Sequence, residues 1–315
     1  MPFHLWPAAD SSSESNLIPR RTFLAGLAAG TMCTAAHSVF AADEPARSPW
    51  FALLSDTHIA ADTATVSRGQ VMADNLRRAI DDILAQPGKP QGFLVDGDLA
   101  LRDGQLDDYR TLLKLLEPVR AAKIPVHLAL GNHDDRTHVR EVVTSAVAKT
   151  AATTDKPPVD RFVSVVDGPG FRMLVLDSLD VVNGVPGRLG QAQLDWLAAT
   201  LDASPALDAL VFVHHNPANS PSALLDTEAL LKVLKPRRQA KAVFFGHTHV
   251  WEVKQDEGLH LVNLPAVAYP FANTQPIGWV AMRAIAEHQV QLQLRCIGGN
   301  TQRDREEVVL KFRSA

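Results

Sequence analysis

The chain has 315 residues, of which 46% are hydrophobic and 21% charged, a composition that supports a sizeable core and argues against intrinsic disorder. Its 31 Lys and Arg residues stand against 35 Asp and Glu residues, so a formal net charge of −4 gives no basic face for nucleic acid. The only two cysteines, Cys33 and Cys296, exclude a disulfide-built scaffold, and the twelve histidines are the unusual feature of the composition.

The first 41 residues predict an export signal rather than a folded segment. A polar leader precedes Arg20 and Arg21, and no further charged residue occurs before Asp43. The apolar stretch ends in Val39-Phe40-Ala41, whose small residues suit a signal peptidase. The arginine pair resembles the twin-arginine signal, which is read by the twin-arginine export machinery and carries folded proteins across the membrane. We expect cleavage after Ala41 and a periplasmic or secreted protein with no stable membrane partner; an uncleaved membrane anchor is the alternative.

Strands and helices alternate in the first part of the remaining chain. Continuous apolar runs predict three buried strands, over residues 50–55, 92–95 and 125–130. Apolar residues at helical spacing predict a helix after each strand, over residues 66–86, 109–119 and 139–148. Continuous apolar strands joined by helices are typical of a sheet that is buried on both faces.

The pattern becomes richer in strands toward the C-terminus. Two strands, over residues 161–166 and 171–176, are joined by a Gly- and Pro-containing segment that predicts a hairpin. Helices over 191–201 and 224–234 then alternate with strands over 210–213 and 242–245. The β-rich residues 250–312 suggest a second sheet packed on the first. Because no linker interrupts the pattern, we predict one α/β domain over residues 47–315.

Five of the predicted strands run into loops that carry metal-ligand chemistry. These loops are Asp56-Thr57-His58, Gly97-Asp98, Gly131-Asn132-His133-Asp134, His214-His215 and Gly246-His247-Thr248-His249. Ligands of α/β sheets bind outside the carboxyl ends of the strands, so we expect the loops to meet. A single Asp-x-His occurs by chance, but five such loops in order indicate a metal centre. Carboxylates and imidazoles without a thiolate suit Mn, Fe, Zn or Mg.

This series of motifs resembles the calcineurin-like metallophosphoesterases, whose pattern is D-x-H, GD, GNH[DE], [GH]H and GHxH. The resemblance covers about residues 51–270. The flanking sequence is most similar to the bacterial class III cyclic-nucleotide phosphodiesterases, in residues 97–99, 131–136, 175–178 and 193–197. The family fold implied is a four-layer αββα sandwich of two mixed β-sheets flanked by helices.

The resemblance further implies two metal ions. One is expected on Asp56, His58 and His249, the other on Asn132, His215 and His247, with Asp98 bridging both. His215 is preferred to His214 because family members with a single histidine here keep it two residues before the proline. His214 and Asp96 are then expected to contact and orient the ligands without binding the metals themselves. Leu101 stands where purple acid phosphatases have a ferric-binding tyrosine, which excludes that type of iron site but leaves the metal otherwise open.

The reaction implied by the resemblance is phosphoester hydrolysis by a hydroxide held between the two metals. His133 is the expected general acid for the leaving alkoxide, with Asp134 orienting its imidazole. Arg136 is the candidate contact with the substrate phosphate, and a solvated charge is the alternative. The motif loops contain no lysine and only this nearby arginine, which favours a small phosphodiester over a more highly charged monoester.

Two other functions stay open. One is a phosphomonoesterase of the same fold, and the other is a non-catalytic metal-binding scaffold, which has no need of His133. The loops expected to cover the site are residues 182–188, 218–223 and 269–274. We interpret His127 and Trp251 as core residues, and His138, His260 and His288 as solvated.

Overall fold

The computed structural model describes residues 48–146, 158 and 160–314. The predicted export signal, residues 1–41, lies outside the described residues. Within them, no helix has the length and apolar character needed to cross a membrane.

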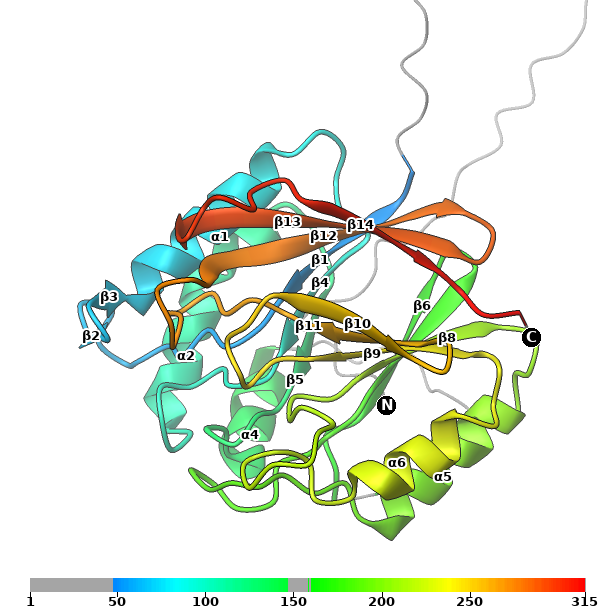
Figure 1. Cartoon of the computed structure of the whole chain (residues 1–315). Coiled ribbons are helices and arrows are strands. Elements are labelled where there is room, and N and C mark those ends of the chain that lie inside the picture. Colours follow the sequence, from blue (N-terminus) through cyan, green and yellow to red (C-terminus); the bar gives the residue numbers. More distant parts are fainter. Residues whose placement is uncertain (1–47, 147–157, 159, 315) are drawn as a thin grey trace, which may run out of the picture. The chain divides into compact units, whose positions relative to one another are not determined.

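Two six-stranded mixed sheets lie at the centre of the described unit (Figure 1). The first sheet has, in spatial order, β14 (Glu307–Lys311), β13 (Gln289–Gly299), β12 (Pro276–Ala286), β1 (Trp50–Leu54), β4 (Gly92–Asp96) and β5 (Val126–Ala129). The second has β10 (Glu252–Asp256), β11 (Leu259–Asn263), β9 (Ala240–Phe245), β8 (Asp208–Phe212), β7 (Phe171–Val175) and β6 (Ser164–Gly168). The strands that precede the motif loops are parallel to one another within each sheet: β1, β4 and β5 in the first, and β8 and β9 in the second.

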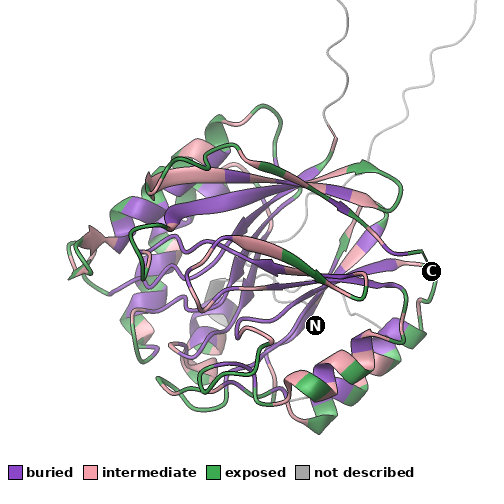
Figure 2. Cartoon of the chain, viewed as in Figure 1, coloured by how far each residue is buried: buried purple, intermediate pink, exposed green. Residues whose placement is uncertain are grey.

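Helices cover the outer face of each sheet. The helices are α1 (Met72–Ala85), α2 (Leu106–Leu115), α3 (Glu117–Ala121), α4 (Arg136–Ala146), α5 (Gln191–Asp202) and α6 (Thr227–Leu234). Successive strand residues point to opposite faces, so Ala52 and Leu54 of β1 pack with α1 and α2 while Phe51 and Leu53 face the second sheet. A third apolar cluster joins the second sheet to α5 and α6. The three clusters separate four layers, as the resemblance implies, and the central strands β1, β4 and β8 are buried along their whole length (Figure 2).

The C-terminal strands depart from the prediction. Residues 250–312 do not form the second sheet by themselves: β10 and β11 join it at one edge, but β12, β13 and β14 extend the first sheet. β12 pairs antiparallel with β1, from Trp50 opposite Arg283 to Leu53 opposite Val280. The first seven residues of β12 are all buried, which fits a strand inside a sheet that is covered on both faces.

The segment predicted as the start of the first helix is also different. Residues Val66–Ser67 and Gln70–Val71 form a small antiparallel hairpin, β2–β3, and α1 begins only at Met72. Arg68 and Gly69 between them both have positive φ, 49° and 76°, the backbone of a tight hairpin turn. This turn is incompatible with a helix, so the helix begins only where the apolar residues recur at helical spacing.

Three single-residue interpretations can be compared with the structure. His127 on β5 and Trp251 are buried, as expected for core residues. His260 was expected in solvent, but it is buried on β11. Its Nε2 lies 2.9 Å from the carbonyl oxygen of Lys311, so the end of the chain covers this ring.

Candidate metal centre

The five motif loops meet at the carboxyl ends of β1, β4, β5, β8 and β9, and backbone hydrogen bonds tie them together. The amide of His58 donates to the carbonyl of Asp98 (2.9 Å), and the amide of Gly246 donates to the carbonyl of His214 (3.1 Å). The amide of His133 donates to Oδ1 of Asp98 (2.9 Å). The prediction that these loops converge is therefore confirmed.

The backbone is strained at this convergence. Five of the seven predicted ligands have φ between 45° and 64°, a region that non-glycine residues rarely occupy; they are Asp56, His58, Asp98, His247 and His249. Such strain is held only where the surrounding structure fixes it, and it clusters at functional sites. Glycines let the loops approach, because a Cβ on Gly131 or Gly246 would collide with Asp98 or Asp56.

Asp56, His58 and His249 form one buried group of potential ligands. The Nε2 atoms of the two histidines are 3.3 Å apart, and Nε2 of His249 lies 3.2 Å from Oδ1 of Asp56. Nδ1 of His249 lies 2.5 Å from the carbonyl of Tyr269, and Nδ1 of His58 lies 3.3 Å from that of Leu101. Because a carbonyl only accepts, each Nδ1 carries the proton, and two Nε2 lone pairs face each other. A cation between them removes this repulsion.

A second group contains Asp98, His214 and His247, and Asp98 also forms a group with His58 and the half-buried His133. Nε2 of the buried His214 lies 3.2 Å from Oδ2 of Asp98, while its Nδ1 lies 2.7 Å from the carbonyl of Asp96. The same carboxylate oxygen is 3.7 Å from Nε2 of His58, so Asp98 stands between the two groups, as a bridging ligand must. Asp96 itself is buried behind His214 and reaches it through this backbone carbonyl.

The remaining predicted ligands also offer free donor atoms. Oδ1 of Asn132 and Nε2 of His215 are buried atoms without a hydrogen-bond partner among the described residues. Nδ1 of His215 lies 2.8 Å from Oγ of Ser178, and its ring centroid is 4.7 Å from that of His247. His214 thus enters the ligand group more directly than expected, and His215 stays a predicted ligand with a suitable free nitrogen.

The protonation states agree with a site built for cations. Burial lowers the pKa of His58 and of His247 to about 4, so both rings are neutral and keep a lone pair. Burial alone would also lower the pKa of His214, but the carboxylates of Asp98 and Asp56 raise it to about 10. The buried carboxylates of Asp56 and Asp98 therefore stabilise positive charge placed next to them. Buried, unpartnered O and N donors around two carboxylates fit divalent metal ions.

The predicted partnership of His133 and Asp134 is wrong. Nδ1 of His133 lies 2.6 Å from the carbonyl of Arg102, which orients the half-buried ring. The buried carboxylate of Asp134 turns away and accepts hydrogen bonds from the amides of Leu99 and Gly131 and from the hydroxyl of Tyr109. Burial raises the pKa of Asp134 to about 7. The amide of Ala100 is a fourth donor to this carboxylate. Asp134 therefore holds the loop together and does not contact the imidazole.

Arg136 is likewise not a substrate contact. Its guanidinium donates two hydrogen bonds to the buried carboxylate of Asp177, at 2.6 and 3.0 Å, and another to the carbonyl of Leu179. The motif spacing placed the residue beside the site, but its side chain satisfies a buried carboxylate instead. Arg136 therefore fastens the first turn of α4 to the loop after β7.

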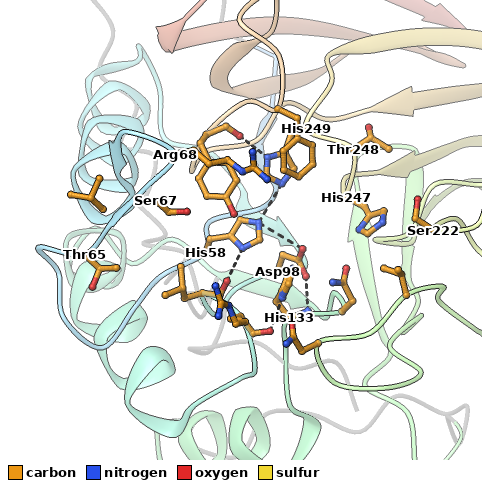
Figure 3. A pocket seen from close by; sticks show the side chains of 18 residues that line it. His58, Thr65, Ser67, Arg68, Asp98, His133, Ser222, His247, Thr248 and His249 are labelled. Atoms are coloured by element: carbon orange, nitrogen blue, oxygen red, sulfur yellow. Dashed lines mark hydrogen bonds and ion pairs between the residues drawn. The ribbon is translucent and has the colours of Figure 1, made fainter.

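A pocket of about 750 Å³ opens over the two ligand groups (Figure 3). His58, Asp98, His133, His247 and His249 line its floor. All three predicted covering loops contribute to its walls, through Asn183, Val185, Ser222, Tyr269 and Phe271. Sequence reasoning missed Arg68 and Arg102, which also line the pocket. The Arg68-Gly69 turn pair was the available signal for the first, hidden because the segment was interpreted as helix.

The fold and the site define a class of hydrolases that hold metal ions at the carboxyl ends of strands in a four-layer sandwich. Residues 49–251 match the calcineurin-like phosphoesterase family, and the chain belongs to that family. It is a metal-dependent phosphoric ester hydrolase.

Individual relatives are more distant. The chain is 28% identical over 225 residues to the 3′,5′-cyclic adenosine monophosphate phosphodiesterase CpdA of Pseudomonas aeruginosa, a match that covers 70% of this chain and 76% of the relative. The protein of that name from Haemophilus influenzae is 27% identical, with 69% and 76% covered. Among solved structures, a dimetal phosphatase from Danio rerio has a TM-score of 0.64 at 18% identity, with 85% of this chain and all of that chain covered. This last likeness concerns the fold.

Proposed function

We propose that the protein is a phosphodiesterase with a binuclear metal centre that acts on small phosphodiesters. Asp56, His58 and His249 would hold one metal ion, and Asn132, His215 and His247 the other, with Asp98 shared. His214 would support Asp98, which its Nε2 approaches to 3.2 Å. Mn, Fe, Zn and Mg all suit these ligands. The observation that carries the proposal is the junction of the two ligand groups through Asp98, on the floor of the pocket.

The bound metals would supply charge for the phosphoryl oxygens and an activated water. His133 completes the site as the general acid. The carbonyl of Arg102 accepts the Nδ1 proton of its ring, so the protonated imidazole offers its other proton, on Nε2, to the leaving oxygen. The half-buried ring lines the pocket beside Asp98 and His58, where a substrate phosphate bound on the floor meets it.

The pocket favours a diester over a monoester because it has room and apolar walls for a second ester arm. Its volume is typical of sites that enclose whole small molecules rather than a phosphate alone. Val66, Val185, Tyr269 and Phe271 are among the residues that line it and offer apolar contacts. The named phosphodiesterase relatives agree with this preference. The small number of Lys and Arg residues in the motif loops no longer supports a diester preference, because Arg68 and Arg102 also line the pocket.

The proposal includes export. Arg20 and Arg21, the uncharged stretch after them and the small residues before Ala42 support a twin-arginine precursor that matures in the periplasm or outside the cell. Export in the folded state suits an enzyme whose site is assembled from five separate loops.

Paired chromogenic substrates test the diester preference. The purified mature protein, loaded with Mn²⁺, is assayed on bis(p-nitrophenyl) phosphate and on p-nitrophenyl phosphate. We expect the larger kcat/KM for the diester. The reverse order, persisting with Zn²⁺ and Fe²⁺, would assign the protein to the phosphomonoesterases, and inactivity toward both esters would favour the scaffold.

A further inference from the structure

Arg68 occupies an unusual position at the mouth of the pocket. It stands at the turn of the β2–β3 hairpin, across the pocket from His247 (Figure 3). The residue is exposed, and in the part of the chain that the structure describes no carboxylate forms an ion pair with it. Some other surface arginines are paired, such as Arg77 with Asp74. A free guanidinium that faces a substrate pocket is available to a ligand.

Aromatic contacts fix the place of this guanidinium. Its carbon lies 4.8 Å from the ring centroid of Phe271 and 5.6 Å from that of Tyr269. Phe271 in turn stacks on the predicted metal ligand His249, with 4.0 Å between centroids and 13° between planes. An arginine held by its face against aromatic rings keeps its N–H edges free for hydrogen bonds to an anion. Arg68 is therefore positioned near the metal groups without being neutralised.

The backbone conformation of the turn gives no reason for an arginine at position 68. Hairpin turns with two positive φ angles favour Asn-Gly or Gly-Gly, because other residues are strained there. The space around Gly69 is open, so the hairpin packs no core residue at its tip. The role of Arg68 thus lies in its side chain, which reaches the pocket.

We propose that Arg68 is a specificity-determining residue that binds a negatively charged group on the ester arm that remains attached during the reaction. The preferred substrates would be phosphodiesters whose arm carries an oxyanion group, such as a carboxylate or a second phosphate. This inference rests on the proposed phosphodiesterase function and adds a substrate class to it. The guanidinium forms charge-assisted, geometrically specific hydrogen bonds with such groups.

Three diesters with one leaving group test it. Each carries p-nitrophenolate and a second arm of similar size: phenyl, 4-carboxyphenyl or 4-(trimethylammonio)phenyl. For the wild type we expect kcat/KM about tenfold higher for the carboxyphenyl than for the phenyl arm, and lowest for the cationic arm. Arg68→Gln should remove this order, and Arg68→Lys should keep part of it. Arg77→Gln, on α1 outside the pocket lining, should behave as wild type.

Two results would overturn the proposal. One is that Arg68→Gln keeps the wild-type order of kcat/KM for the three arms, whereas Arg102→Gln loses it. The other is an equal loss for all three arms in Arg68→Gln, which would make Arg68 only a support for Phe271.

Binding of uncleaved analogues separates this inference from the proposed function. Calorimetry compares (4-carboxybenzyl)methylphosphinate and benzylmethylphosphinate, which have P–C bonds in place of both ester bonds, on wild type and Arg68→Gln. If the wild type hydrolyses no diester but binds the carboxybenzyl analogue about tenfold more tightly, and only while Arg68 is present, the proposed function fails and the anion site stands. Equal affinities of the two proteins for both analogues would contradict the anion site itself.

Discussion

His133 is the residue whose role separates a catalyst from a metal-binding scaffold. Its ring lines the pocket and is oriented through Nδ1 by the carbonyl of Arg102. We expect His133→Ala to keep its metal content and to lose about 10²–10⁴ in turnover, most for diesters with poor leaving groups. Elemental analysis and rates across a leaving-group series check both parts.

A matched control is His138→Ala. His138 is a partly exposed histidine whose Nδ1 also contacts a loop carbonyl, that of Gly104 at 2.7 Å, but it does not line the pocket. This variant should stay active. If His133→Ala loses metal along with activity, His133 is a ligand, as its grouping with His58 and Asp98 would then indicate.

Residue types and their order were sufficient to predict which side chains gather at the site. Asp56, His58, Asp98, His247 and His249 come together because each follows a buried parallel strand, and this is visible in the sequence. The direction in which a side chain points within its loop cannot be predicted from the sequence in this way. Asp134 and Arg136 lie beside the predicted ligands in the sequence, yet each turns to a buried partner that a linear motif does not reveal.

At the scale of elements, the junction between α4 and the loop after β7 depends on Arg136 and Asp177. The carboxylate is fully buried, and the guanidinium pairs with it through two hydrogen bonds. Arg136→Ala leaves this charge uncompensated, so we expect the free energy of unfolding to fall by about 3 kcal/mol.

Urea unfolding and steady-state kinetics measure this effect. KM of the folded Arg136→Ala fraction should equal that of the wild type. Arg110→Ala, which removes an exposed arginine of α2, should leave stability nearly unchanged. A large rise in KM at unchanged stability would return Arg136 to the substrate contacts.

Element boundaries were predicted well where a strand or helix has a simple period, and poorly where a turn interrupts it. The hairpin formed by β2 and β3 occupies the start of the segment predicted as helix, and the Arg68-Gly69 pair that signals its turn was outweighed by the helical spacing that follows. This small element matters for function because it brings Arg68 to the pocket.

At the scale of the whole molecule, the two-sheet architecture was predicted, but the sheet that receives β12, β13 and β14 was not. Strand periodicity indicates burial and cannot say which open edge a strand joins. The antiparallel pairing of β12 with β1 places the C-terminal strands beside the strand that leads to Asp56. The first strand of the domain and its C-terminal strands therefore lie in the same sheet.

Export concerns the whole precursor. Replacing both Arg20 and Arg21 by lysine should block recognition of a twin-arginine signal, while the rest of the chain stays unchanged. We expect full-length precursor in the cytoplasm of the variant, and for the wild type a periplasmic form that begins near Ala42. Fractionation and N-terminal sequencing measure both. Normal export of the double-lysine variant would exclude the twin-arginine pathway.

We expect hydrolysis to require two metal ions held by ligand groups that share Asp98. The most direct measurement adds Mn²⁺ to chelator-treated protein and follows bound metal together with the hydrolysis of bis(p-nitrophenyl) phosphate. Activity should rise with bound metal and reach its maximum at two bound equivalents. Asp98→Ala, in parallel, should bind far less metal and stay inactive, whereas Asp81→Ala on the exposed face of α1 should match the wild type. Full activity without metal, or two tightly bound equivalents in Asp98→Ala, would contradict this expectation.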